Sequence, residues 1–276
     1  MLFNVPIGEL AVFAVALVGA GALTGILAGV FGVGGGALIV PVLYELFRFL
    51  GVPEEVRMAV CVGTSLAIIV PTSLRSFQAH KARGTVDMQI IRDWAVPCVI
   101  GVALGALFAR YASPAVFKMV FVFVALLNAT RLIFDLPWRF GTDMPKGPLM
   151  KLYGFLIGLL SALMGIGGGQ ISTMIMTFYN RPIHQAVSTS AGVGILISIP
   201  GALGYMAAGF DKVGLPPLSI GYVSAIGLVL FAPVSVWTAP IGVKLAHSLA
   251  KRTLERAFGI FLLLVSLRFI ASLAGY

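Results

Sequence analysis

Long apolar runs separated by short connections constrain this chain more than any other feature of its sequence. Hydrophobic residues fill 59% of the 276 positions and charged residues only 11%, whereas a soluble globular chain carries roughly a quarter charged residues. A core of this size cannot hide so much apolar surface from water. Most runs reach the roughly 20 residues that an apolar helix needs to cross hydrocarbon. We therefore predict an all-α integral membrane protein.

The apolar pattern predicts ten helices, and two of them, Ala37–Leu50 and Gln170–Tyr179, are too short to cross a bilayer comfortably. The connections stay below about twenty residues, which leaves no room for a soluble catalytic domain. The two cysteines lack CxxC spacing and the histidines form no HExxH pattern, so we expect no metal site, no cofactor and no enzymatic activity. The basic residues flank the apolar runs, which is typical of membrane proteins and argues against a nucleic-acid partner.

The second half of the sequence repeats the first. Residues 25–36 (GILAGVFGVGGG) align without a gap with residues 158–169 (GLLSALMGIGGG), and residues 117–131 match residues 254–268 at a constant offset. Internal repeats of this kind are common in membrane transporters, where they are either parallel or inverted. We expect two homologous transmembrane repeats that together form one membrane domain: residues 1–140 and residues 141–276.

Loop charge separates the parallel from the inverted arrangement, because cytoplasmic loops carry excess lysine and arginine. If each glycine-rich segment is a break within one spanning helix, the 19 basic residues divide ten to nine and show no bias. If each segment is instead the tip of a helix–break–short helix hairpin, re-entrant or fully spanning, the basic residues divide thirteen to six between the two sides. The two repeats are then inverted. We favour the hairpin, with the N-terminus and the side poorer in basic residues outside the cell.

Two glycine tracts are the strongest candidates for a binding site. Glycine costs roughly 1 kcal/mol in a helix interior relative to alanine, so several in a row unwind a helix. Unwound backbone at membrane depth is tolerated only against protein or a wet cavity, and free N–H groups at a helix N-terminus attract anions. Tight helix packing through small residues is the alternative. The candidate substrate-binding glycines are Gly34, Gly35, Gly36, Gly167, Gly168 and Gly169.

Polar side chains near the tracts are further candidates for contact with a substrate. Gln170 follows the second tract and offers two N–H donors, whereas its counterpart Ala37 offers none, so we expect a chemically asymmetric site. The candidate hydroxyls, which bond either to an anion or to their own helix, are Thr64, Ser65, Thr189 and Ser190. Three arginines near helix ends are candidates for contact with the substrate or for closing a gate, and the alternative is that their side chains extend to the membrane interface. They are Arg75, Arg131 and Arg268.

Acidic residues are informative through their positions. All ten fall near predicted helix ends or in short segments, and none lies in the middle of a span. Cation carriers and proton pumps usually keep a carboxylate within the membrane. The sequence therefore favours an anionic or neutral substrate.

The doubled glycine tract, the elements Gly63-Thr64-Ser65 and Ser188-Thr189-Ser190, and the closing stretch 254–258 (LERAF) resemble the TauE/SafE sulfite exporter family over almost the whole chain. The resemblance implies a secondary transporter, and an exporter, of a small anion such as sulfite, sulfoacetate or another organosulfonate in the bacterial inner membrane. It identifies neither the anion nor a coupling ion, so proton and sodium coupling stay open, as does a homodimer.

Two other functions stay open at this point. An anion channel for the same substrates has the same sequence features as a carrier. A membrane scaffold without transport activity has glycine tracts that pack directly against helices. An intramembrane enzyme is disfavoured, because no carboxylate pair and no nucleophile–histidine pair stands out.

Overall fold

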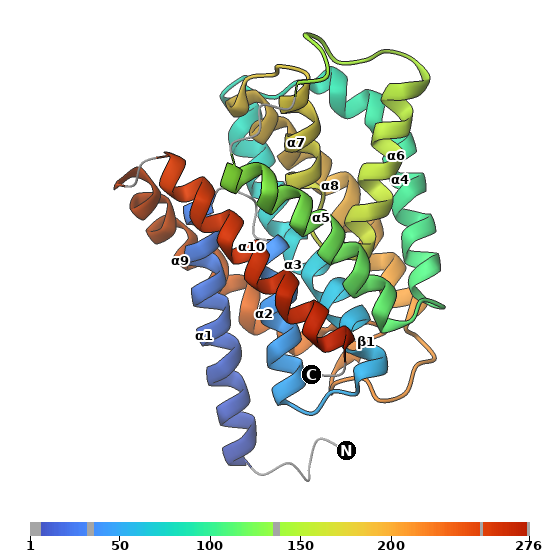
Figure 1. Cartoon of the computed structure of the whole chain (residues 1–276). Helices are drawn as coiled ribbons and strands as arrows, with labels where there is room; N and C mark the ends of the chain where they lie inside the picture. The colour runs from blue at the N-terminus through green and yellow to red at the C-terminus, as the bar shows by residue number, and fades with distance from the viewer. Residues whose placement is uncertain (1–6, 32–35, 135–138, 249–250, 275–276) are drawn as a thin grey trace.

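The chain folds into ten helices and one short β-hairpin in a computed structural model that describes residues 7–31, 36–134, 139–248 and 251–274 (Figure 1). The elements are α1 (Ile7–Phe31), α2 (Gly36–Phe49), α3 (Glu54–Ala82), α4 (Met88–Ala109), α5 (Pro114–Phe134), α6 (Pro148–Met164), α7 (Gly169–Phe178), α8 (Ile183–Ala208), β1 (Ser219–Ile220), β2 (Val223–Ser224), α9 (Ala225–Ser248) and α10 (Lys251–Leu273).

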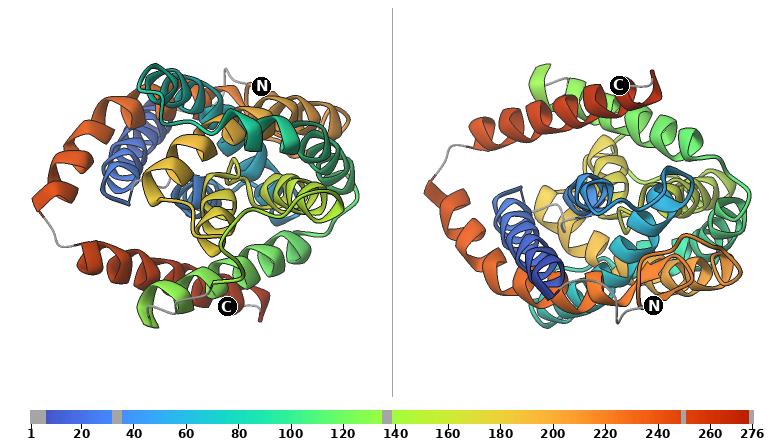
Figure 2. Two further views of the ribbon diagram at one scale, coloured as in Figure 1. Left: turned by 90° about the horizontal axis from the view of Figure 1, so that it is seen from above. Right: turned by 90° about the horizontal axis from the view of Figure 1, so that it is seen from below.

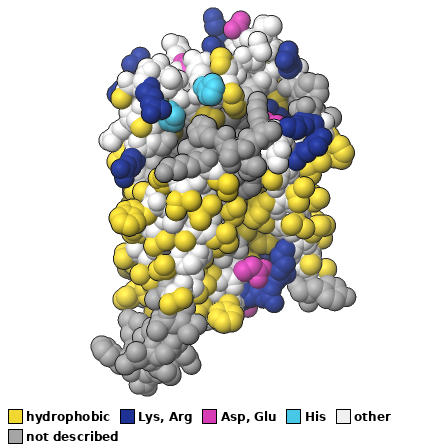
Figure 3. All heavy atoms as spheres, turned by 90° about the vertical axis from the view of Figure 1, so that its left-hand side faces the viewer, with side chains coloured by type: hydrophobic (Ala, Val, Ile, Leu, Met, Phe, Trp, Pro, Cys, Tyr) yellow, Lys and Arg dark blue, Asp and Glu magenta, His cyan; other side chains and the backbone are white. Residues whose placement is uncertain are grey.

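Six of the described helices are long and apolar enough to cross a membrane: α3, α4, α5, α8, α9 and α10. Each of them exposes large hydrophobic side chains, for example Val96, Phe123, Leu203 and Trp237. Figure 3 shows a belt of such side chains across one face, with lysine and arginine side chains gathered above it and a smaller group of basic and acidic side chains in its lower part. Exposed apolar surface of this extent is stable in lipid and not in water. The prediction of an all-α, multi-pass membrane protein is confirmed.

Helix α3 lies at the centre of the molecule. It packs against α8, α2, α5 and α9, and 72% of its most apolar segment is buried, compared with 28% for α10. Figure 2 shows the same arrangement from above and below: α4, α5, α9 and α10 lie toward the outside, and α2, α3 and α7 lie nearer the middle. The residues of α3 are therefore placed to contact a site inside the protein.

Helices α6 and α7 form a hairpin whose turn is the second glycine tract. Its open end is held by Tyr153 and Tyr179, whose hydroxyl oxygens lie 2.7 Å apart, and by the Phe140 N–H, which donates to the Phe178 carbonyl at 2.9 Å. The predicted hairpin is confirmed in this half of the chain, so a break inside one continuous helix is wrong there. In the first half, α1 and α2 flank residues 32–35, which lie outside the described residues.

The helix pairings are matched between the two halves. α1 packs against α9 as α6 packs against α4, and α2 packs against α3 as α7 packs against α8. α3 also packs against α8, and α5 against α10. In Figure 1 the open end of the α6–α7 hairpin lies at the top, called the upper end below, whereas α1 begins at the lower end. These features support two inverted repeats, residues 1–140 and 141–276, which remain a prediction.

The start of α9 differs from the sequence pattern. The apolar run predicts a helix over Leu218–Val243, but α9 begins at Ala225, because β1 and β2 form a hairpin in front of it. Gly221 turns this hairpin with a φ of +55°, and the Tyr222 N–H donates to the Tyr205 carbonyl at the end of α8 at 3.1 Å. The hairpin therefore lies against the lower end of the core.

Ion pairs join helices at the lower end. Lys118 on α5 is only 1% exposed, and its Nζ donates to Glu54 on α3 at 2.6 Å and to Ser272 on α10 at 2.8 Å. Arg268 on α10 lies 2.9 Å from Glu45 on α2. A buried lysine is uncommon unless it is paired, so Lys118 fixes three helices relative to one another at this end.

Candidate functional site

The second glycine tract is an unwound turn at the tip of the α6–α7 hairpin. Gly165, Gly167 and Gly168 have φ angles of +69°, +61° and +73°, a left-handed conformation that glycine adopts without steric cost. The Gly165 N–H donates to the Ser161 carbonyl at 2.9 Å and so ends α6. The predicted break therefore lies at the expected residues, and α7 begins at Gly169.

The tract lies between the middle turns of α3 and α8. A Cβ atom on Gly167 would lie 2.7 Å from Ile69 Cγ2, and one on Gly168 would lie 2.1 Å from Ile197 Cδ1. Both isoleucines belong to central turns of helices that are long enough to span the membrane. The tract is therefore at mid-membrane depth, and close packing is one reason why these two positions are glycine.

The N-termini of α2 and α7 meet at this tract. A Cβ atom on Gly36, the first residue of α2, would lie 2.6 Å from the Ile166 carbonyl oxygen, so the two backbones are in direct contact. From here α2 runs toward the lower end and α7 toward the upper end (Figure 1). The positive ends of both helix dipoles therefore face each other. Gly36 therefore lies against the residue that precedes Gly167–Gly169, whereas Gly34 and Gly35 lie outside the described residues. A role of these glycines in binding a substrate remains a prediction.

Backbone N–H groups at both N-termini have no hydrogen-bond acceptor within the described part of the chain. They belong to Gly36, Ala37 and Leu38 in α2, and to Gly167, Gly168, Gly169, Gln170 and Ile171 at the start of α7. Every helix leaves such groups at its first turn, but in a membrane interior each one costs several kcal/mol unless something satisfies it. A small anion between the two N-termini would do so.

Two of the predicted hydroxyls bond to carbonyl groups. Ser65 Oγ on α3 donates to the Gly165 carbonyl at 2.7 Å and therefore holds the tract itself. Ser190 Oγ donates to the Val187 carbonyl of its own helix at 2.8 Å, which is the local bond that the sequence left open.

The two predicted threonines make equivalent contacts in the two halves. Thr64 Oγ1 accepts a hydrogen bond from the Ser224 N–H, and Thr189 Oγ1 accepts one from the Asp87 N–H, both at 2.9 Å. Each threonine thus holds the segment that follows the partner helix, α8 in the first case and α3 in the second. Whether these four hydroxyls also contact a substrate remains a prediction.

Three polar side chains near the tract have no hydrogen-bond partner within the described residues. Gln170 is 8% exposed, and the hydroxyls of Ser161 and Ser198 are fully buried. Ser161 Oγ lies 3.4 Å from the place that a Cβ on Gly168 would occupy. Buried polar groups are nearly always paired, so these side chains are suited to a ligand. The sequence analysis selected Gln170 but missed both serines, since isolated serines in apolar runs carry no distinctive pattern.

The repeat-related arginines make equivalent contacts as well. Arg131 Nη2 on α5 donates to Thr177 Oγ1 on α7 at 2.9 Å, and Arg268 Nε on α10 lies 2.9 Å from Glu45 on α2. Each arginine joins the last helix of one half to the short helix that follows a glycine tract. Arg75 is exposed on α3. A role in gating or substrate contact remains a prediction for all three.

Comparisons with known proteins agree with this architecture. The family model described as "Sulfite exporter TauE/SafE" matches residues 17–269. A "Probable membrane transporter protein" of Haemophilus influenzae is 32% identical over 248 residues, which cover 90% of this chain and 94% of that protein. A protein of the same description from Methanocaldococcus jannaschii is 29% identical, and the alignment covers 88% of this chain and 93% of that protein. Another from Bacillus subtilis is 25% identical, and the alignment covers 93% of this chain and 97% of that protein.

No solved structure matches the chain. The family match extends over nearly all of the sequence, and the relatives are aligned over almost their whole length. Together with the six apolar helices, these matches show that the chain belongs to the TauE/SafE sulfite exporter family and is a multi-pass membrane transporter.

Proposed function

We propose that the chain is a secondary carrier that exports a small oxyanion, such as sulfite or an organosulfonate, across the bacterial inner membrane. The observation that carries this proposal is the contact between the N-termini of α2 and α7 at Gly36 and Ile166. Each helix N-terminus carries about half an elementary positive charge, so two facing N-termini repel each other unless an anion lies between them. The same anion accepts hydrogen bonds from their free N–H groups.

The side chains around this contact suit an anion better than a cation. Ser161, Ser198 and Gln170 offer uncharged donors that have no described partner. No carboxylate is among the described close contacts of the tract glycines, and the described residues hold no cluster of three metal-ligating side chains. A buried cation requires carboxylate or carbonyl oxygens, whereas an anion requires donors of the kind found here.

The charge distribution supports an orientation in which the upper end faces the cytoplasm. Lysine and arginine side chains gather above the hydrophobic belt in Figure 3, and membrane proteins keep such residues on the cytoplasmic side. Since α1 begins at the lower end (Figure 1), the N-terminus is then external. The anion enters from the upper end, binds at the glycine tract and leaves at the lower end. Arg131 and Arg268 keep each short helix attached to its neighbour as access alternates.

The test is counterflow of radiolabelled sulfite, and separately of sulfoacetate, into proteoliposomes containing the full chain. Gln170→Ala removes an amide without a described partner, so it should slow transport at least tenfold while leaving the protein folded. The matched control is Gln78→Ala, which removes the same side chain from an exposed position on α3 and should leave transport unchanged. Equal rates in the two variants would refute the site. Uptake that neither saturates nor shows counterflow would refute a carrier and favour a channel.

A further inference from the structure

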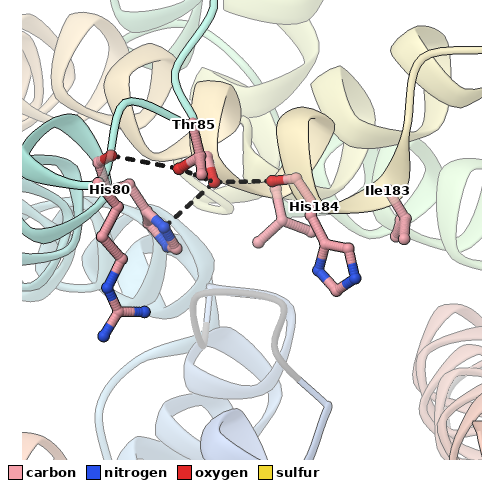
Figure 4. Close-up of a pocket in the computed structure, with 7 residues that line it drawn as sticks. His80, Thr85, Ile183 and His184 are labelled. Carbon is pink, nitrogen blue, oxygen red and sulfur yellow. Dashed lines mark hydrogen bonds between the residues drawn. The ribbon is translucent and has the colours of Figure 1, made fainter.

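A pocket that contains two histidines, an arginine and two hydroxyl side chains opens between the end of α3 and the start of α8 at the upper end (Figure 4). Its volume is about 560 Å³, and it is lined by His80, Arg83, Thr85, Ile183, His184, Val187 and Ser188. Figure 4 shows His80 and His184 on either side of the hydrogen-bonded group that contains Thr85. The pocket is separate from the glycine tract and contains none of the residues assigned to the central site.

The hydrogen bonds in this pocket orient its donors. Ser188 Oγ donates to the His184 carbonyl at 2.7 Å and accepts from Thr85 Oγ1 at 2.9 Å. His80 Nδ1 lies 3.1 Å from the same oxygen. Which of the two atoms donates depends on the tautomer of the His80 ring. The contact holds this ring beside Ser188.

The charges of the lining residues favour an anion. Arg83 is exposed, and its guanidinium makes no ion pair or hydrogen bond within the described residues. No carboxylate is among the lining residues, so the pocket carries the permanent positive charge of Arg83 beside two imidazole rings. A small oxyanion, with several acceptor atoms, complements this set of donors.

The equivalent place at the lower end is closed. Thr64 at the lower end and Thr189 at the upper end occupy equivalent positions, and so do the residues that donate to them. Counting back from these two pairs, Gly63 corresponds to Ser188, and Tyr222 corresponds to Thr85. A Cβ atom on Gly63 would lie 2.5 Å from the Tyr222 carbonyl oxygen, and the Tyr205 ring is fully buried beside it. Burial raises the pKa of the Tyr222 hydroxyl, which therefore stays neutral. Polar residues at the upper end thus occupy the positions that form a closed seal at the lower end.

The pocket lies on the way to the glycine tract along α8. Ser188 lines the pocket, whereas a Cβ atom on Gly194, less than two turns further along, would lie 3.3 Å from the Gly167 carbonyl oxygen. We propose that this pocket is a second, weaker binding site for the transported oxyanion, where the anion is captured from the upper side before it passes to the glycine tract. The proposal rests on the proposed function for the identity of the central site.

Equilibrium binding of radiolabelled sulfite to the purified full chain tests the proposal. Wild type should bind two sulfite ions per chain with different affinities. Arg83→Gln and His184→Gln should each weaken the lower-affinity site about two- to fivefold, the range expected for an exposed charge, and should raise KM for transport without lowering the maximal rate. Arg92→Gln removes a positive charge from exposed α4 outside the pocket and is the matched control.

The outcomes separate this proposal from the function of the central site. Gln170→Ala should weaken the tighter site and slow transport at least tenfold but leave the weaker site intact. A single sulfite per chain, with Arg83→Gln indistinguishable from Arg92→Gln, would overturn the second site and leave the carrier proposal standing. If Gln170→Ala instead binds and transports normally while Arg83→Gln weakens binding, the pocket stands and the central site fails.

Discussion

Replacement of Ser161 by alanine distinguishes a ligand-binding hydroxyl from a structural one. Ser161 Oγ is completely buried beside the glycine tract and has no described hydrogen-bond partner. An unpaired buried hydroxyl costs about 1–3 kcal/mol in desolvation. The void left by one oxygen atom offsets only a few tenths of a kcal/mol. Ser161→Ala should therefore stabilise the folded protein by about 1 kcal/mol, which corresponds to roughly 2 °C in Tm for a chain of this size.

The loss of the hydroxyl should at the same time weaken anion binding. Thermal unfolding of the purified chain, with and without sulfite, measures both effects, because at a fixed ligand concentration a tighter ligand raises Tm more. Ser161→Ala should have the higher Tm without sulfite and the smaller rise with it. Ser266→Ala is the control: Ser266 is equally buried, but its Oγ donates to the Leu262 carbonyl at 2.7 Å on α10. The reasoning fails if both variants lose stability and both keep the full response to sulfite.

Substitutions at three further places have expected effects on stability, each measured by thermal or denaturant unfolding. Glu54→Gln should destabilise the folded protein by about 3 kcal/mol, since it leaves the buried Lys118 cation without an ion-pair partner. Lys118→Met should cost much less stability, because the carboxylate that it frees is half exposed. Equal losses in the two variants would contradict this reasoning. Ser65→Ala should cost about 1–3 kcal/mol by leaving a buried tract carbonyl unpaired. Gly168→Ala should be severely destabilising, and Ile197→Val in the same chain should recover the steric part but not the roughly 1–2 kcal/mol of left-handed strain.

The features that the sequence predicted correctly depend on local chemistry. Runs of apolar residues specify helices of spanning length, and consecutive glycines specify where α6 stops and α7 starts. The alignment of the two halves also pairs Arg131 with Arg268, and in the structure the two arginines make matching contacts with the short helices. Each of these inferences uses neighbours in the chain or the repeat itself, so no knowledge of tertiary contacts is required.

The features that were missed depend on residues that are distant in sequence. Ser65 was selected as a ligand candidate, but its bond to the carbonyl of Gly165 could not be foreseen, since the two residues meet only through packing of α3 on the hairpin. The burial of Lys118 follows from the convergence of three helices. The β-hairpin before α9 replaced an expected helix because Gly221 can take a positive φ where the chain turns against α8.

At the upper end Ser188, His80 and Thr85 occupy the places that Gly63, Tyr205 and Tyr222 hold at the lower end. This difference should make the two faces of the proposed carrier kinetically unequal. Exposing the glycine tract to the lower side requires the Tyr222 backbone to separate from Gly63, whereas closing the upper side requires polar groups to lose water. These steps differ in free energy, and a difference of about 1.4 kcal/mol makes one orientation tenfold more populated. For the proposed carrier, half-saturation concentrations measured from opposite sides of an oriented vesicle should therefore differ.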